Sequence, residues 1–352
     1  MQPRDRVADV RKIAVLRANA IGDFFFSLPA LEAVRAAYPG AEIVLLGQHW
    51  HGGFLAGRPG PIDRVVVVPS SRGVYEWPNR PEDPAELEAF FAAMAGERFD
   101  LALQLHGGGR YSNPFVRSLG ARVTAGLKAP EAAPLDLWVP YVYFQPEILR
   151  YLEAVSLVGA TVGDLEPKLA VTLRDLAESR AVVPEADAPL VVLHPGAGDP
   201  QRRWPPGHFA AVGDALAAAG ARVVVTGIAR ERPLAEAVVA AMTAEAQDVS
   251  GILSLEGLAG LLARCRVVVS NDSGPLHLAA AVGAATVGIY WCGNLITAGP
   301  PTRTRHRPAL AWRLACPACG QDCMQANCRH PVSFVADVPA EEVIASALEL
   351  LA

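Results

Sequence analysis

The stretch between Val267 and Gly283 constrains the fold more than any other part of the chain. It begins with three valines at 267–269, and such β-branched apolar residues are typical of a strand buried inside a parallel sheet. The polar residues Asn-Asp-Ser-Gly at 271–274 and the following Pro275 favour the start of a helix. Gly283 suits the end of that helix. The stretch therefore predicts a strand, a tight turn and a helix.

A turn of this kind is a candidate anion site. Backbone N–H groups at the start of a helix have no partner within the helix, and the helix dipole favours negative charge there. At the carboxyl end of a parallel strand, such a turn faces the usual ligand crevice of an α/β sheet. We therefore expect Ser273 and Gly274 to hold a diphosphate, although the same pattern also fits an ordinary strand-to-helix turn.

Strand and helix patterns alternate along the chain and restart after residue 186. This alternation predicts an α/β fold of two doubly wound, Rossmann-like domains. The first domain is expected over residues 1–175 and the second over residues 186–335, with a linker rich in Ala, Pro and charge between them. Residues 336–352 contain a C-terminal helix, which is a candidate to pack back on the first domain. Residues 128–146 and 292–334 are expected to be irregular.

Composition argues against several classes of protein. The chain has 31 basic and 36 acidic residues, so it lacks the basic excess that non-specific nucleic-acid binding requires. No apolar run approaches the roughly 20 residues of a membrane-spanning helix, and the N-terminal residues lack the apolar core of a secretory signal. We therefore expect a cytoplasmic protein with no transmembrane segment and no nucleic-acid partner.

Three loops in the second half follow predicted strands and should meet at one edge of the sheet. The loop after residues 190–194 supplies glycines, which let backbone approach a ligand, and two arginines, which suit phosphate. The loop after residues 222–226 supplies a carboxylate that suits ribose hydroxyls, and the third loop is the turn at 271–274. A ligand with a diphosphate, a ribose and a neutral sugar would use all three. The candidate residues are Gly196, Arg202, Arg203, Glu231, Asp272, Ser273, Gly274 and His277.

Asp23 follows the first predicted strand, which spans residues 13–16. One interpretation is that Asp23 caps a helix that runs to Tyr38. The other is catalytic, because a carboxylate beside an acceptor hydroxyl can take its proton as a new bond forms. The residues alone leave both interpretations open.

Four cysteines crowd into residues 316–328. They are Cys316, Cys319, Cys323 and Cys328. Four thiolates at this spacing can surround one tetrahedral zinc or iron ion in a structural role, with His330 as a substitute ligand. Free thiols and disulfides are the alternatives, and a cytoplasmic setting disfavours the disulfides.

Three motifs resemble those of the ADP-heptose:lipopolysaccharide heptosyltransferase family, glycosyltransferase family 9. They are Arg17-Ala-Asn-Ala-Ile-Gly-Asp-Phe-Phe-Phe-Ser27, Arg-Arg-Trp-Pro-Pro-Gly-His-Phe209 and Ser-Asn-Asp-Ser-Gly-Pro-Leu-His277, in the order of the family. The resemblance implies a GT-B fold, in which two Rossmann-like domains face each other across a cleft. It also implies an inverting, metal-independent transfer of a sugar from a nucleotide donor, with ADP-heptose as the expected donor.

The resemblance implies roles for single residues. Asp23 matches the proposed general base, and Arg202 matches a phosphate contact that is often Lys in the family. Asp272 matches a carboxylate on the donor sugar, Ser273 and Gly274 match the phosphate turn, and Glu231 matches a ribose contact. No cofactor is expected for catalysis. The acceptor, whether a glycan, a lipid-linked molecule or a small molecule, stays open, and peripheral contact with the inner membrane fits this function.

Three other functions share parts of this pattern. A nicotinamide-dependent oxidoreductase requires Gly-x-Gly-x-x-Gly at the start of a helix, and Gly196-Ala-Gly198 is not followed by the third glycine. A nucleotide-sugar epimerase or hydrolase, and a non-catalytic nucleotide-sugar binding protein, use the same fold. Donor turnover with and without acceptors separates these from a transferase.

Overall fold

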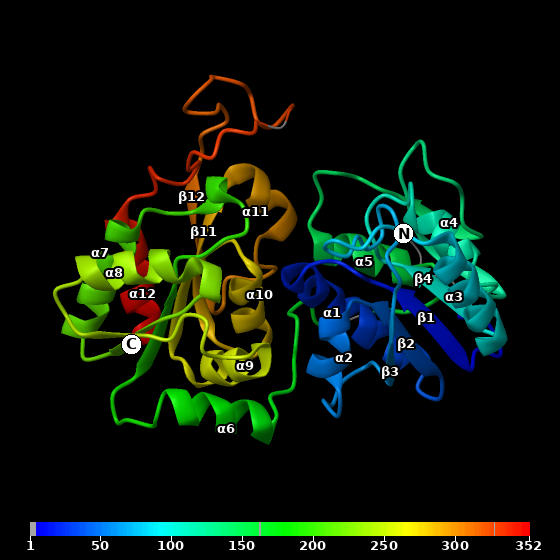
Figure 1. Cartoon of the computed structure of the whole chain (residues 1–352), viewed down its shortest axis with the longest axis horizontal. Helices are drawn as coiled ribbons and strands as arrows, with labels where there is room; N and C mark the ends of the chain where they lie inside the picture. Colours follow the sequence, from blue (N-terminus) through cyan, green and yellow to red (C-terminus); the bar gives the residue numbers. More distant parts are fainter. Residues whose placement is uncertain (1–4, 162, 327) are drawn as a thin grey trace. The chain divides into compact units, whose positions relative to one another are not determined.

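The computed structural model describes residues 5–161, 163–326 and 328–352 (Figure 1). The chain divides into two compact units between Pro167 and Lys168. The predicted boundary, between 175 and 186, lies further along the chain. It misses a helix at Leu173–Val182, which packs against a helix at Leu255–Arg264 and therefore belongs to the second unit.

The first unit is built on one parallel sheet with the strand order β3-β2-β1-β4-β5-β6. Its strands are β1 (Lys12–Leu16), β2 (Glu42–Gly47), β3 (Arg64–Val67), β4 (Leu101–Gln104), β5 (Val123–Lys128) and β6 (Leu137–Pro140). Its helices are α1 (Ile21–Ala37), α2 (His49–Leu55), α3 (Pro84–Glu97), α4 (Ser112–Arg117) and α5 (Glu147–Ser156). The order reverses between β1 and β4, so the loops after these two strands flank the switch point where ligands bind in such sheets.

The second unit repeats this arrangement with the order β12-β11-β10-β7-β8-β9. Its strands are β7 (Leu190–His194), β8 (Arg222–Val225), β9 (Ala246–Asp248), β10 (Val267–Asn271), β11 (Ala285–Trp291) and β12 (His306–Ala311). Its helices are α6 (Leu173–Val182), α7 (Pro206–Ala218), α8 (Arg232–Ala241), α9 (Leu255–Arg264), α10 (Gly274–Ala281), α11 (Cys292–Ala298) and α12 (Ala340–Leu351), with short 3₁₀ turns η1 (Pro200–Arg202) and η2 (Ala229–Glu231). The switch point lies between β10 and β7.

The central strands are buried because they are almost wholly apolar. In β1, residues 13–16 have no exposed surface, and the same holds for 43–46 in β2, 191–193 in β7 and 267–269 in β10. Strands covered on both faces are typical of parallel sheets. The predicted α/β class with two doubly wound, Rossmann-like units is therefore confirmed.

Two segments that were expected to be irregular contain edge strands. Residues 128–146 include β6, and residues 292–334 include β12 together with helix α11. Both strands pair along one side only and are partly exposed, so their sequences lack the continuous apolar run that marks a central strand.

The terminal helix α12 packs in the second unit, against α7 and the sheet (Figure 1). Val343 and Ala347 on this helix have no exposed surface and belong to the same apolar cluster as Trp204. The expectation that this helix packs back on the first domain is therefore wrong, because its apolar face is taken up by the core of the second unit. Among the helices of the described residues, none is long and apolar enough to cross a membrane.

Candidate active site

Asp23 lies in the first turn of α1, which begins at Ile21. The N-cap position is Ala20, and the interpretation of Asp23 as the helix cap is therefore wrong. The helix begins three residues earlier than expected, and a carboxylate in its first turn still interacts favourably with the helix dipole. The Asp23 side chain is 38% exposed, so it is accessible at the carboxyl end of β1.

Arg17, the first residue after β1, holds Asp23 in place. Its Nε and Nη2 donate to the Asp23 backbone oxygen at 3.0 and 2.7 Å, and Nη2 lies 3.5 Å from the Asp23 carboxylate. Nη1 donates to the Leu105 backbone oxygen at 2.7 Å, which ties this loop to the loop after β4. Arg17 is only 2% exposed, and sequence reasoning missed its role. The available signal was an arginine directly after the apolar run at residues 13–16.

A second carboxylate, Glu147, lies near the same guanidinium nitrogen. Its Oε2 is 4.0 Å from Arg17 Nη2, and the side chain also contacts Arg150 and Tyr151. Burial raises the pKa of Glu147, and the charges of Arg17 and Arg150 oppose that shift. The two carboxylates therefore differ: Glu147 is largely enclosed, while Asp23 is open to an approaching molecule.

Two buried histidines hold the neighbouring loop backbone. The Nδ1 of His106 accepts a hydrogen bond from Ala18 N at 3.2 Å, and the Nδ1 of His51 accepts one from Gln48 N at 2.9 Å. Burial lowers the pKa of each to about 3, so both are neutral at neutral pH. A neutral ring is also what these hydrogen bonds require, because each Nδ1 must keep its lone pair.

In the second unit, Asn271 joins the loops that follow two neighbouring strands. Its Nδ2 donates to Pro195 O at 2.8 Å, and its Oδ1 accepts from Trp204 N at 3.0 Å. Arg203 closes the same loop by donating twice to Ala197 O, at 3.0 and 2.8 Å. The loops after β7 and β10 therefore meet as predicted. The Arg203 guanidinium, however, binds the backbone oxygen of Ala197 within the loop after β7.

Asp272 is the centre of a polar cluster. It is 2% exposed, and its Oδ1 lies 3.1 Å from His277 Nε2. Its Oδ2 accepts from Arg202 Nη1 at 3.2 Å and from Asn294 Nδ2 at 2.8 Å. Burial raises the pKa of Asp272, but these partners outweigh burial and the pKa lies below its usual value. The Arg202 side chain is 42% exposed, so this buried anion anchors an accessible cation.

Asn294 was not among the predicted site residues, because it lies in α11, within the segment that was expected to be irregular. The start of α10 follows the prediction more closely. Ser273 is the N-cap residue and Gly274 the first helical residue. The Ser273 hydroxyl lies 3.2 Å from the Ser270 hydroxyl and does not cap the helix, so it does not occupy the first N–H groups of α10.

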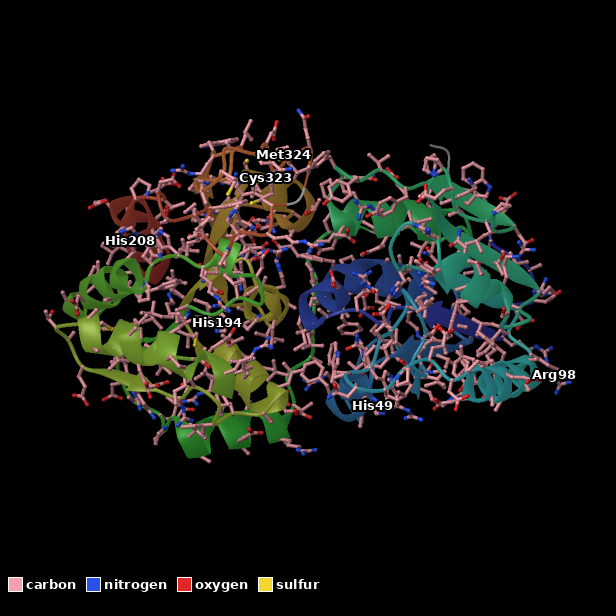
Figure 2. All side chains as sticks on the ribbon, turned by 45° about the horizontal axis from the view of Figure 1, so that its top comes forward. His49, Arg98, His194, His208, Cys323 and Met324 are labelled. Atoms are coloured by element: carbon pink, nitrogen blue, oxygen red, sulfur yellow. The ribbon has the colours of Figure 1, made fainter. Side chains whose placement is uncertain are left out.

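Glu231 and Gly196 depend on each other. Glu231 is buried, and its Oε2 accepts from Ile228 N at 3.0 Å. Its carboxylate packs against Gly196 so closely that any Cβ at position 196 would overlap it. Burial lowers the pKa of the adjacent His194, which is labelled within the second unit in Figure 2. Its ring Nδ1 lies 3.1 Å from the backbone oxygen of Thr226. A larger residue at position 196 would therefore require the Glu231 carboxylate to move.

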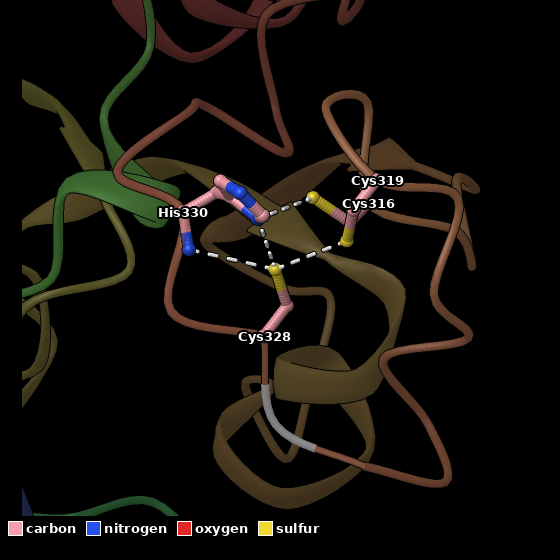
Figure 3. Close-up of side chains that lie close together, drawn as sticks. All are labelled: Cys316, Cys319, Cys328 and His330. Atoms are coloured by element: carbon pink, nitrogen blue, oxygen red, sulfur yellow. Dashed lines mark hydrogen bonds between the residues drawn. The ribbon is translucent and has the colours of Figure 1, made fainter.

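The cysteine segment brings four potential ligands together (Figure 3). The sulfurs of Cys316, Cys319 and Cys328 and a ring nitrogen of His330 all lie within 4.8 Å of one another. Cys323 is not in this group of four, and its sulfur contacts the Gln321 backbone oxygen at 3.3 Å. The structure therefore gathers three of the four predicted cysteines with His330, the predicted substitute ligand. All of these cysteines are free thiols, so the disulfide alternative is not observed.

Comparison with solved structures identifies the fold. A glycosyltransferase family 9 protein from Veillonella parvula superposes with a TM-score of 0.80, at 20% identity over 99% of both chains. The ADP-heptose lipopolysaccharide heptosyltransferase II of Escherichia coli gives a TM-score of 0.75, at 20% identity over 97% of this chain and 98% of the other. The two units thus form the GT-B fold of these enzymes.

Sequence comparison gives the family. The model of glycosyltransferase family 9 (heptosyltransferase) matches residues 87–316. A lipooligosaccharide heptosyltransferase 2 from Haemophilus influenzae is 25% identical over 319 residues, which cover 85% of this chain and 86% of that relative. The chain therefore belongs to glycosyltransferase family 9 and is a glycosyltransferase.

Proposed function

We propose that this glycosyltransferase transfers a heptose from ADP-heptose to a hydroxyl group of a lipopolysaccharide core or a related glycan, with inversion and without a catalytic metal. The names of its relatives support the sugar and the nucleotide, since one similar structure is an ADP-heptose lipopolysaccharide heptosyltransferase and one relative a lipooligosaccharide heptosyltransferase. The observation that carries the proposal is the Asp272 cluster, which holds an exposed arginine beside the start of a helix.

The donor is proposed to bind the second unit. Arg202 and the N–H groups at Ser273 and Gly274 offer positive charge to the diphosphate. Asp272 has both oxygens occupied by protein groups, so we assign it a positioning role through Arg202 and His277 in place of direct contact with the sugar. Glu231 remains the proposed ribose contact. Gly196 and Arg203 shape the loop that passes beside it.

The acceptor is proposed to bind the first unit at Asp23. In the reaction, the acceptor oxygen attacks the anomeric carbon, the bond from that carbon to the diphosphate breaks, and ADP leaves. Asp23 takes the proton of the acceptor hydroxyl, and a single displacement of this kind inverts the anomeric carbon. Arg202 and the start of α10 stabilise the charge that grows on the diphosphate, the kind of electrostatic effect that usually contributes most to catalysis.

We also propose that the protein works in the cytoplasm, at the inner membrane where a lipid-linked acceptor would be found. The cysteine segment is proposed to hold a structural zinc or iron ion that takes no part in sugar transfer. Four protein ligands around such an ion leave no position for a substrate.

A transfer assay tests the proposed function. Purified protein is incubated with ADP-heptose and a panel of acceptors, and released ADP and glycosylated product are both measured, with ADP-glucose and UDP-sugars as control donors. We expect ADP release that depends on an acceptor, a product of inverted configuration by NMR, and no increase in rate on adding Mg²⁺. Equal ADP release with and without acceptors would identify a hydrolase and contradict the proposal.

A further inference from the structure

The segment between β12 and α12 contains a set of ligands that the transfer reaction does not use. We propose that Cys316, Cys319, Cys328 and His330 bind one zinc ion, and that this zinc centre fixes the loop that carries Arg202. The first part specifies the ion and ligands of the proposed structural site, and the second rests on the proposed donor site. Cys323 is excluded from the ligand set.

The distances within the cluster fit a tetrahedral ion. Ligand atoms about 2.3 Å (sulfur) and 2.0 Å (nitrogen) from a tetrahedral zinc lie roughly 3.5–3.8 Å from one another. The Cys319 and Cys328 sulfurs are 3.6 Å apart, and the Cys316 sulfur is 3.9 Å from His330 Nδ1. The Cys328 sulfur lies 3.0 Å from His330 Nδ1, so this pair must open by about half an ångström when the ion binds. Three thiolates and one imidazole form a closed set that structural zinc sites use.

The backbone around the ligands is already arranged for thiolates. The N–H groups of Ala318 and His330 donate to the sulfurs of Cys316 and Cys328, each at 3.4 Å. Hydrogen bonds to ligand atoms orient a metal site and stabilise its negative charge. Gly320 has a φ of 72°, which lets the chain turn back after Cys319. Cys323 lies beyond that turn, where its N–H donates to Leu314 O at 2.9 Å.

Gln201 connects this cluster to the donor site. Its side-chain amide donates to the backbone oxygens of Cys328 and His330, at 2.7 and 3.0 Å. Its own backbone oxygen accepts from Phe334 N at 2.8 Å. Gln201 directly precedes Arg202 in the turn η1, so two metal ligands contact the residue next to the proposed diphosphate contact.

The segment has little regular structure of its own to keep this link in place. Between β12 and α12, the described residues contain no helix or longer strand, and Figure 1 shows this part of the chain as a loop that projects from the second unit. A loop without a crosslink loses backbone conformational entropy when it becomes ordered, and this loss opposes a fixed conformation. Zinc would supply that crosslink, so its loss should release Gln201 and disorder Arg202.

Metal analysis tests the ligand set. Protein is purified without a metal-affinity tag, and zinc and iron are measured by elemental analysis. We expect about one equivalent of zinc in the wild type and in Cys323→Ser, and at least a tenfold loss of zinc in Cys319→Ser. Iron in place of zinc, less than a tenth of an equivalent of either metal, or equal loss in Cys323→Ser and Cys319→Ser would overturn the assignment.

Hydrogen exchange tests the coupling without relying on the donor. After zinc removal by a chelator, amides in residues 199–204 should exchange at least tenfold faster, while peptides of β1 and β2 stay unchanged. Gln201→Ala should show the same local effect with its zinc retained. Unchanged exchange at 199–204 in the metal-free protein would overturn the coupling.

ADP affinity, measured by calorimetry on the same samples, separates this inference from the proposed function. We expect about tenfold weaker ADP binding in both the metal-free protein and Gln201→Ala. Adding zinc back to the metal-free protein should restore its affinity for ADP. If the wild type failed to bind ADP while zinc still controlled exchange at 199–204, the proposed donor would be wrong and the zinc centre would stand. Unchanged ADP affinity in the metal-free protein would contradict the link to Arg202.

Discussion

Asp272 and Arg17 have the same physical task in the two units. Each is a charged side chain that is 2% exposed, and each holds a more exposed partner of opposite charge after a central strand. Burying a charge is unfavourable because the charge loses its hydration, and interactions with its partners offset that loss. Substitution of the exposed partner is therefore the informative experiment, because substitution of the anchor would also disturb the fold.

Asp23→Asn should lower kcat by about 10²–10⁴, the usual effect of losing a general base. The amide keeps the size of the side chain, and the Arg17 hydrogen bonds go to the Asp23 backbone oxygen, so α1 should form as before. The measurement is steady-state transfer, with circular dichroism and ADP affinity as controls. Near wild-type kcat in Asp23→Asn would remove Asp23 from the reaction.

Arg202→Ala should weaken binding of ADP, because ADP keeps both phosphates after transfer. A charged hydrogen bond is worth about 1.5–3 kcal/mol, which corresponds to roughly 10–150-fold in affinity. Calorimetry with ADP measures this directly. Arg203→Ala is the matched control, because its guanidinium holds Ala197 O, and its effect should appear mainly as reduced stability. A larger loss of ADP affinity in Arg203→Ala would reverse the two roles.

The sequence indicated which loops form the site but not how the side chains pair. Glycines, caps and charges after apolar runs are local signals, and they led to the loops at 194–204 and 271–274. The contacts of Asp272 with Asn294 and of Gln201 with Cys328 join residues far apart in the chain. Such pairs depend on how the sheet is wound, so no spacing in the sequence reveals them.

At the scale of elements, α6 and α9 pack through glycines. A side chain at Gly260 would meet the backbone oxygen of Asp175, whereas one at Gly257 would meet only the flexible side chain of Glu178. The two helices can therefore approach closely, which is how α6 belongs to the second unit although it precedes that unit's first strand.

Gly260→Ala should lower the free energy of unfolding of the second unit by about 1–3 kcal/mol, because rigid backbone cannot move away from the added methyl group. Denaturant unfolding measures this change. Gly207→Ala in α7 is the control, since no atom lies within 4 Å of its added Cβ and the substitution should be neutral or stabilising by up to about 1 kcal/mol. Equal effects of the two substitutions would show that helix packing is not responsible.

Central elements could be predicted and edge elements could not. Unbroken runs of apolar residues mark β1, β7 and β10, because both faces of these strands are covered. The edge strands β6 and β12 include Trp138 and Arg307, which an exposed edge tolerates. The placement of α12 was also missed. Its amphipathic sequence pattern indicates that one face is buried, but it does not indicate which part of the protein covers that face.

At the scale of the whole molecule, buried histidines link the stability of the first unit to pH. His51 and His106 have pKa values of about 3 when folded, against about 6.5 in an unfolded chain. Between these values the unfolded state binds protons that the native state does not, so stability falls as the pH falls. Going from pH 7 to pH 5 should cost on the order of 2 kcal/mol for each histidine.

Denaturant unfolding of the first unit at pH 7 and at pH 5 measures this loss. His106→Gln should be less stable than the wild type at pH 7 but should lose about half as much stability on acidification, because one of the two titrating groups is gone. An identical loss in the wild type and in His106→Gln would show that other groups cause the pH dependence.

The position of α12 also has a consequence for the order in which the protein is made. The first sheet is complete once residues 12–140 have left the ribosome, so the first unit can fold during synthesis. The second unit stays incomplete for longer, because the apolar face of its sheet and α7 is uncovered until residues 340–351 emerge. At about 5–20 residues per second, the nascent second unit exposes that surface for several seconds or longer. Nascent chains paused before α12 should therefore recruit chaperones through the second unit, while their first unit already resists protease.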